Sequence, residues 1–150
     1  MKAVLDTNVL VSAFLRSKGK PAQILAQGSK FELLLCEEML DELLDVLNRP
    51  RIQRKQPCPQ DQLLEYLRRL RVDSTLVTIL EVENIVLHDP PDNIVLACAV
   101  EGGADYLVSG NKHLLDLEKH RRVKIVTPAQ FLEILQTIEN RKSEIENEAQ

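Results

Sequence analysis

The sequence is poor in aromatic residues and in residues that bind zinc. Its 150 residues include three Phe, two Tyr and no Trp. The core must therefore be aliphatic, and the chain offers no evident aromatic platform for stacking single-stranded bases. Only three His and three Cys are present, so a zinc site is not expected.

Disulfide bonds and membrane spans are not expected either. Cys36, Cys58 and Cys98 form no close pair and no CxxC motif, which is typical of reduced thiols in a cytosolic protein. No apolar run approaches the roughly 18–20 residues of a membrane span. The chain opens on a short apolar segment followed by an acid, without the features of a signal peptide. We therefore expect a cytoplasmic protein without a membrane partner.

The charge balance argues against a protein held to nucleic acid by bulk positive charge. The formal net charge is −4, with 28% charged and 44% hydrophobic residues, which is ordinary for a globular protein. A length of 150 residues suits one domain. We assign that domain to residues 1–138 and treat the charged segment 139–150 as a frayed helix end or a disordered tail.

Short apolar runs alternate with amphipathic segments along the chain. The runs predict strands at residues 2–6, 31–35, 76–80, 85–87, 105–108 and 123–126. The amphipathic segments predict helices at residues 7–14, 21–28, 37–47, 60–70, 112–117 and from 128 onward, with another that begins at Asp92 or Asn93. Residues 51–59 are polar and basic and contain two prolines, and we expect a connection there. Strands that are apolar throughout indicate a parallel sheet, so we expect an α/β three-layer sandwich with helices on both faces.

Four polar residues follow the predicted strands. Asp6 comes directly after the first strand, Glu42 lies one turn or more into the helix after the second, Asp92 opens a helix, and Asn111 follows the strand that ends at Val108. In open parallel sheets, ligands collect beyond the carboxyl ends of the strands. Carboxylates that lie close together repel each other unless a cation neutralises them, and Mg²⁺ and Mn²⁺ prefer such oxygen ligands.

Each of these residues also has a simpler interpretation. Asp6 and Asp92 fit helix-capping acids, Glu42 fits a solvated helix face, and Asn111 fits a turn residue. The spacing alone leaves both interpretations open, because a chain with 23 acids places several of them near strand ends by chance.

Five segments, taken in order, resemble the PIN-domain family. They cover the chain from residue 2 to about residue 135, and they read VLDTNVLVS (4–12), EMLDEL (38–43) followed by Val46-Leu47, DPPDNIVLACA (89–99), ADYLVSGNKHLL (104–115), and IVTP (125–128) followed by Phe131-Leu132. The chain is most similar to the prokaryotic, VapC-like toxins of toxin–antitoxin pairs. This resemblance implies a sheet of about five parallel strands in the order 3-2-1-4-5.

The resemblance also implies an activity and its residues. It implies an endoribonuclease that depends on Mg²⁺ or Mn²⁺, with an RNA substrate, an antitoxin protein as partner and a homodimeric state. Apolar faces of the first two helices that exceed what the core covers would also favour a homodimer. By position, Asp6, Glu42 and Asp92 would be the catalytic, metal-binding acids, and Asn8 and Ser109 would support the site by hydrogen bonding.

One position departs from the family pattern. The fourth family acid is usually Asp, whereas this chain has Asn111. An amide offers an oxygen but does not neutralise charge, so we expect weaker binding of a second ion. Asp89 and Asp116 are nearby acids, but neither matches the family ligand.

Candidate contacts with RNA are Lys112, next to the site, and Arg49 and Arg51 in the polar connection, although each also fits a solubilising surface. Two other functions compete with the nuclease. The first is a catalytically weak or inactive PIN domain that binds nucleic acid or protein, which Asn111 favours. The second is an aspartate-nucleophile phosphatase, which usually needs a second Asp where this chain has Asn8.

Overall fold

A six-stranded sheet with the order β3-β2-β1-β4-β6-β5 forms the centre of the computed structural model, which describes residues 1–86 and 89–148. The strands are β1 (Lys2–Leu5), β2 (Glu32–Leu35), β3 (Thr75–Leu76), β4 (Tyr106–Val108), β5 (Lys119–His120) and β6 (Val123–Val126). All neighbouring pairs are parallel except β5 with β6. The predicted order 3-2-1-4-5 is thereby confirmed for the five parallel strands, and the antiparallel β5 is an addition at one edge.

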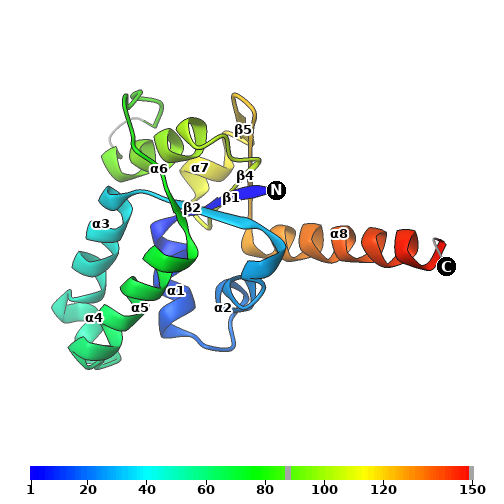
Figure 1. Cartoon of the computed structure of the whole chain (residues 1–150). Helices are drawn as coiled ribbons and strands as arrows, with labels where there is room; N and C mark the ends of the chain where they lie inside the picture. Colours follow the sequence, from blue (N-terminus) through cyan, green and yellow to red (C-terminus); the bar gives the residue numbers. More distant parts are fainter. Residues whose placement is uncertain (87–88, 149–150) are drawn as a thin grey trace.

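Helices cover both faces of this sheet. They are α1 (Thr7–Leu15), α2 (Lys20–Leu25), α3 (Glu37–Leu47), α4 (Pro50–Lys55), α5 (Gln60–Asp73), α6 (Pro90–Glu101), α7 (Lys112–Leu115) and α8 (Pro128–Glu148), with a short 3₁₀ turn, η1 (Gly28–Lys30). Helices α6 and α7 lie on one side of the sheet, and α1, α2 and α8 lie on the other (Figure 1). The expected three-layer α/β arrangement is therefore confirmed.

The predicted connection at residues 51–59 is partly helical. Helix α4 occupies Pro50–Lys55, where Pro50 suits the first turn because its missing N–H is not needed there. Gln53 Nε2 donates to the carbonyl of Leu47 at 2.8 Å, and Gln56 Nε2 donates to the carbonyl of Leu15 at 2.9 Å. These tertiary bonds hold a helix that polarity and proline content argued against.

Two predicted strands are largely absent. Residues 76–80 contribute only Leu76 to β3, because the partner strand β2 ends at Leu35, whose register partner is Leu76. Residues 77–86 lie outside helices and strands, and Leu80 is 81% exposed. The second prediction, 85–87, fails for residues 85 and 86, and Leu87 lies outside the described residues.

The last helix is attached to the sheet by the few aromatic residues of the chain. Phe131 is fully buried, and its ring centroid lies 5.2 Å from that of Phe31 and 5.8 Å from that of Tyr106. Helix α8 continues to Glu148, with residues 139–148 exposed, and projects away from the sheet (Figure 1). The described part of the predicted tail is therefore a helix, while a domain boundary at residue 138 remains a prediction.

The expected surplus of apolar surface on α1 and α2 is not found. In the described residues, the exposed large apolar side chains other than Met1 lie on α5, at residues 76–82 and on α8. The ring of Phe14, on α1, packs against Tyr66 of α5, with centroids 4.8 Å apart. A homodimer remains a prediction that rests on the family resemblance alone. A search of the described residues finds no helix with the length and apolar character to cross a membrane.

Gly102, at the end of α6, packs so closely against the sheet that a larger residue should destabilise the fold. A Cβ atom there would lie 2.7 Å from Leu34 Cδ1 and 2.9 Å from Val77 Cγ2. We expect Gly102→Ala to lower the free energy of unfolding by about 1–3 kcal/mol, measured by urea denaturation. Gly28→Ala is the matched control, because a Cβ at Gly28 meets nothing within 4 Å. Equal losses in the two variants would contradict this account of the packing.

Candidate metal and catalytic site

The candidate site lies at the carboxyl ends of the two central strands. Asp6 follows β1 and Ser109 follows β4, and the last residues of these neighbouring strands, Leu5 and Val108, are register partners. The backbone N–H of Asp6 donates to the carbonyl of Val108 at 2.9 Å, which continues the pairing one residue beyond the strands. The strand order reverses here, and in open α/β sheets this is where a ligand-binding crevice is expected, beyond the carboxyl ends of the strands.

A chain of hydrogen bonds connects two of the predicted acids. The hydroxyl of Ser109, which is fully buried, donates to Asp6 Oδ2 at 2.8 Å. It also accepts the backbone N–H of Asn111 at 2.9 Å. The Nδ2 group of Asn111 then donates to Asp92 Oδ2 at 2.8 Å. Ser109 and Asn111 therefore orient Asp6 and Asp92 from the loop after β4.

Both ends of the Asn111 amide are hydrogen-bonded, and its role as a weak metal ligand stays a prediction. Its Oδ1 accepts the backbone N–H of His113 at 2.9 Å and so caps the short helix α7. The amide therefore presents its N–H₂ group to Asp92, while its oxygen is engaged at the helix. In this arrangement Asn111 is a hydrogen-bond donor to an acid.

Glu42 enters the site from α3. It is half-buried, and its Oε2 accepts a hydrogen bond from Thr7 Oγ1 at 3.3 Å. Thr7 is the first residue of α1 and follows Asp6 directly. This contact brings α3 beside the start of α1, so Glu42 is not simply a solvated side chain.

Burial distinguishes the acids from ordinary helix caps. Asp6 is 3% exposed and Asp92 is 5% exposed. Asp6 precedes α1, yet its side chain makes no capping hydrogen bond. Helix α6 begins at Pro90, with Asp89 at the position before it, so the expectation that Asp92 or Asn93 opens the helix was wrong. Pro90 supplies the backbone angle for a first turn, and Asp92 lies within that turn.

Asp89 is the acid whose place sequence reasoning underestimated. Its charge contributes to raising the pKa of Asp6, Glu42 and Asp92, which places it near all three. Pro90 and Pro91 form the start of α6, with Asp89 just before the helix and Asp92 in its first turn, so both acids lie at the same helix end. The Asp-Pro-Pro-Asp spacing was the signal for this arrangement.

Negative charge is concentrated in a partly dehydrated crevice. Burial raises the pKa of Asp6 and of Glu42, against the hydrogen bonds from Ser109 and Thr7, respectively. Burial, with the charges of Asp89 and Asp6, raises the pKa of Asp92 to about 7, although Asn111 opposes this shift. Strongly shifted carboxylates gathered in a crevice are typical of functional sites.

The raised pKa of Asp92 predicts a specific dependence of stability on pH. The folded protein without metal retains a proton on Asp92 that the unfolded chain loses above pH 4, so stability falls as the pH rises from about 4 to about 7. Asn cannot ionise, so we expect Asp92→Asn to be more stable than wild type by roughly 1–2 kcal/mol at pH 8 and equally stable at pH 4. Urea denaturation in EDTA measures this difference. The exposed Asp116→Asn variant is the control, and a difference that does not vary with pH would contradict the prediction.

Asn93 is a structural residue of the site that was missed. Its Oδ1 accepts the backbone N–H groups of Ile85 and Val86 at 3.0 and 2.7 Å, and its Nδ2 donates to Asn84 Oδ1 and to the carbonyl of Val86 at 3.2 and 3.0 Å. The buried amide thereby attaches residues 84–86 to the first turn of α6. Only its place next to Asp92 could have suggested this role.

The other predicted site residues lie on the surface. Asn8 is exposed, and the described residues include no hydrogen bond from its side chain. Lys112 is exposed at the start of α7, beside Asn111. Arg49 is exposed, pairs with Asp45 at 3.4 Å and lowers the pKa of Glu42. Arg51 is exposed on α4.

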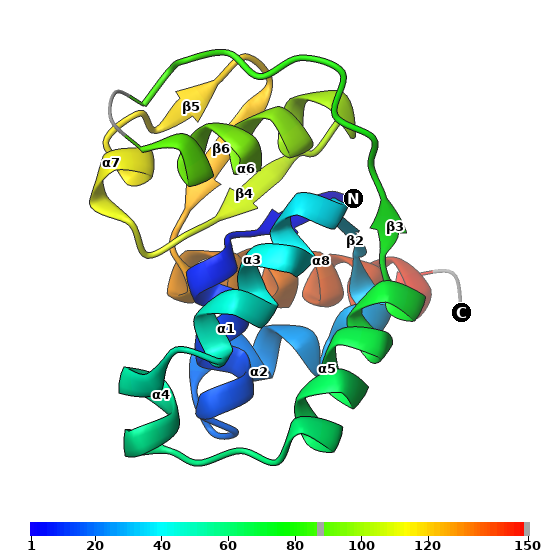
Figure 2. The same ribbon diagram turned by 90° about the vertical axis from the view of Figure 1, so that its left-hand side faces the viewer.

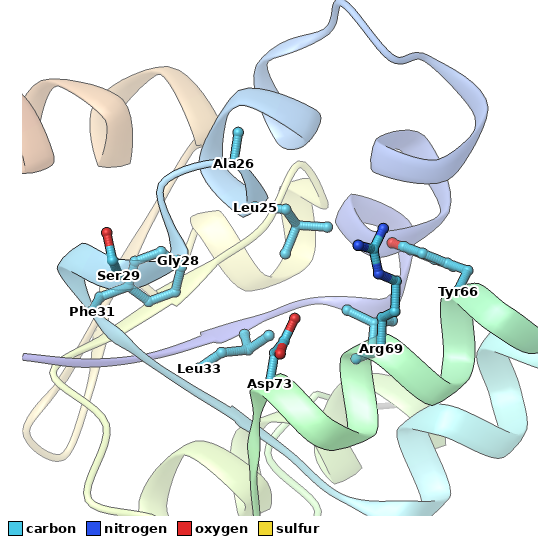
Figure 3. Close-up of a pocket in the computed structure, with 10 residues that line it drawn as sticks. Leu25, Ala26, Gly28, Ser29, Phe31, Leu33, Tyr66, Arg69 and Asp73 are labelled. Atoms are coloured by element: carbon cyan, nitrogen blue, oxygen red, sulfur yellow. The ribbon is translucent and has the colours of Figure 1, made fainter.

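A separate hollow lies away from the acids. This cavity of about 630 Å³ is bounded by α2, η1, β2 and α5, and Figure 3 shows Tyr66, Arg69 and Asp73 projecting from α5 on one side of it. None of the predicted site residues lines it. We therefore restrict the candidate chemistry to the crevice around Asp6 and Asp92.

The donor set fits a hard divalent cation in an open site. Among residues 1–86 and 89–148, no three Asp, Glu, His or Cys side chains form a group that could hold a metal ion by themselves. Magnesium, however, is usually bound through one or two carboxylates, with waters and substrate phosphate completing its shell. Carboxylates of Asp6 and Asp92 in one crevice meet that requirement.

Comparisons with known proteins identify the family and the fold. The family model of the PIN domain matches residues 2–113, which is most of the chain. A solved structure, VapBC2 from Rickettsia felis bound to a DNA fragment from their promoter, contains a chain with 14% sequence identity and a TM-score of 0.60. The alignment covers 85% of this chain and 98% of that chain, and at this identity it shows the fold. No curated protein sequence matches. The chain therefore belongs to the PIN-domain family.

Proposed function

We propose that this protein is an endoribonuclease that depends on Mg²⁺ or Mn²⁺ and hydrolyses RNA phosphodiester bonds with a metal-activated water. PIN domains are generally nucleases. The observation that carries the proposal is a set of acids at the carboxyl ends of the central strands: burial, together with the charge of Asp89, raises the pKa of Asp6, Glu42 and Asp92. The carboxylates in such a cluster repel one another, and a bound cation would neutralise that repulsion.

In this proposal Asp6 and Asp92 bind the metal directly, and Glu42 adds negative charge beside them. A bound divalent ion would supply a water of lowered pKa and would stabilise the charge that develops on a phosphoryl oxygen. Ser109 orients Asp6, Thr7 orients Glu42, and Asn111 orients Asp92 through the hydrogen bonds described above. These neutral donors keep the carboxylates in place without neutralising them.

The test is a cleavage assay with purified protein and a labelled single-stranded RNA. We expect cleavage with Mn²⁺ or Mg²⁺ and none in EDTA. If neither ion supports cleavage, the enzyme proposal fails. The alternative, a PIN domain that binds without cleaving, is favoured by Asn111, which donates a hydrogen bond where the family usually has an acid.

We further propose a toxin role with an antitoxin partner. The support is the likeness to a chain of VapBC2, whose structure includes promoter DNA, together with the family resemblance. A neighbouring gene for a small DNA-binding protein that forms a stable complex with this chain is the expected result. If the protein cleaves RNA but no such partner is found, the toxin role fails and only the ribonuclease proposal stands.

A further inference from the structure

Helix α4 presents a cationic face that the candidate site does not use. Arg51, Arg54 and Lys55 are exposed and spaced i, i+3 and i+4, so they lie on one side of the helix. Ile52 and Gln53 are half-buried and lie toward the protein. We name Arg51, Arg54 and Lys55 the α4 basic face.

The charge of this region is opposite to that of the whole chain. Residues 46–60 contain Arg49 and the α4 basic face but no Asp or Glu, whereas the chain has a net charge of −4. In the described part of the chain, the recorded ion pairs include none from the α4 basic face. Like charges at these spacings destabilise a helix by about 0.2–0.5 kcal/mol per pair, and a bound polyanion would remove that cost.

The fold holds this helix in place despite the repulsion. A six-residue helix is too short to be stable on its own. Gln53 and Gln56 attach α4 to the carbonyls of Leu47 and Leu15, and Gln53 Oε1 also accepts the backbone N–H of Cys58 at 3.3 Å. The cationic side chains are therefore displayed from a positioned element.

The α4 basic face lies on the flank of the candidate site. Helix α3, which carries Glu42, ends at Leu47, and α4 begins three residues later at Pro50. In Figure 2, α4 and α7 are on the same side of the molecule, and the start of α1 lies between them. An RNA strand that crosses the site near Asp6 would therefore be able to continue onto α4.

We propose that the α4 basic face binds backbone phosphates of the RNA strand beside the bond that is cleaved. This inference rests on the proposed function for the identity of the strand. Arg51, Arg54 and Lys55 supply positive charge that the acidic crevice lacks, and they hold the strand by phosphate contacts that do not depend on base sequence.

The test compares two triple variants that remove the same charge. One is Arg51→Gln/Arg54→Gln/Lys55→Gln, and the control is Lys119→Gln/Arg122→Gln/Lys124→Gln, which removes three exposed cations of the β5–β6 hairpin. Binding of a fluorescent 12-nucleotide RNA is measured by anisotropy in EDTA over a series of NaCl concentrations. Circular dichroism checks folding, and Arg54→Glu is a second, single-residue variant.

We expect the α4 variant to bind at least about tenfold more weakly than wild type at 0.1 M NaCl. The slope of log affinity against log salt concentration is negative, and its magnitude should fall by about 2, since each phosphate contact on a single strand contributes about 0.7. The hairpin variant should change the magnitude of this slope by less than about 0.7, the value of one phosphate contact. Equal losses in both variants, or wild-type RNA binding by the α4 variant, as expected of a surface for an acidic protein, would overturn the inference.

The two proposals fail separately. If the wild-type protein binds RNA through α4 but cleaves none with Mn²⁺, the nuclease proposal fails and the α4 surface stands. If the protein cleaves RNA and the α4 variant binds RNA like wild type, the α4 inference fails and the nuclease stands.

Discussion

Replacing Asp6 by Asn should reduce Mn²⁺-dependent RNA cleavage by at least about 100-fold, and Asp92→Asn should do the same. Charge stabilisation by a metal amounts to several kcal/mol of the activation barrier, and each 1.36 kcal/mol corresponds to a factor of ten in rate. Both side chains are buried and hydrogen-bonded, to Ser109 and Asn111. The substitution keeps their shape and removes one charge, so the lost activity reports on charge.

Single-turnover cleavage rates measure this effect, with Asp116→Asn as the control. Asp116 is exposed and follows α7, so its variant should cleave at the wild-type rate. The Asp92→Asn variant adds a second check, because it should be more stable than wild type at pH 8 while it is inactive. Cleavage by Asp6→Asn and Asp92→Asn at the wild-type rate would show that another site or a contaminating nuclease is responsible.

Replacing Asn111 by Asp should tighten Mn²⁺ binding by about tenfold and increase the cleavage rate. The new carboxylate would face Asp92, where the wild-type amide donates at 2.8 Å. Asp is as good a helix cap as Asn, so it can still accept the N–H of His113 and keep α7 intact. The added charge should make the metal-free protein less stable and should favour the metal-bound form.

Isothermal titration calorimetry with Mn²⁺ measures the affinity, and cleavage assays measure the rate. Asn140→Asp is the matched control, because Asn140 is exposed on α8 and the variant carries the same change in charge. An unchanged affinity in Asn111→Asp would place position 111 outside the metal shell. An inactive wild type together with an active Asn111→Asp would support the binding-module alternative.

Most of the parallel sheet follows from the sequence because its strands are short apolar runs separated by helical patterns. The run before Asp6 and the run before Ser109 are apolar throughout, which is typical of central strands that helices cover on both faces. The prediction failed at the edges. Residues 76–80 have strand-forming side chains, but β2 offers a partner for only one of them, Leu76.

The acids could be predicted only in part. Asp6 and Asp92 stand out because they follow strands or prolines in a family pattern, but spacing alone did not distinguish them from caps. Asp89 was set aside because it does not match a family position. Its importance depends on where the start of α6 lies relative to Asp6 and Glu42, which is a property of the folded chain.

By itself, the sequence determined the α/β class, the strand order through its family motifs, and the identity of the acids that follow the strands. Only the tertiary structure decided how those acids interact. It placed Ser109 and Asn111 between Asp6 and Asp92, turned the oxygen of Asn111 toward α7, and held α4 as a helix through Gln53 and Gln56. The reason is physical: apolar periodicity is local along the chain, whereas hydrogen bonds and charge interactions join side chains that are distant in sequence and depend on burial in the folded protein.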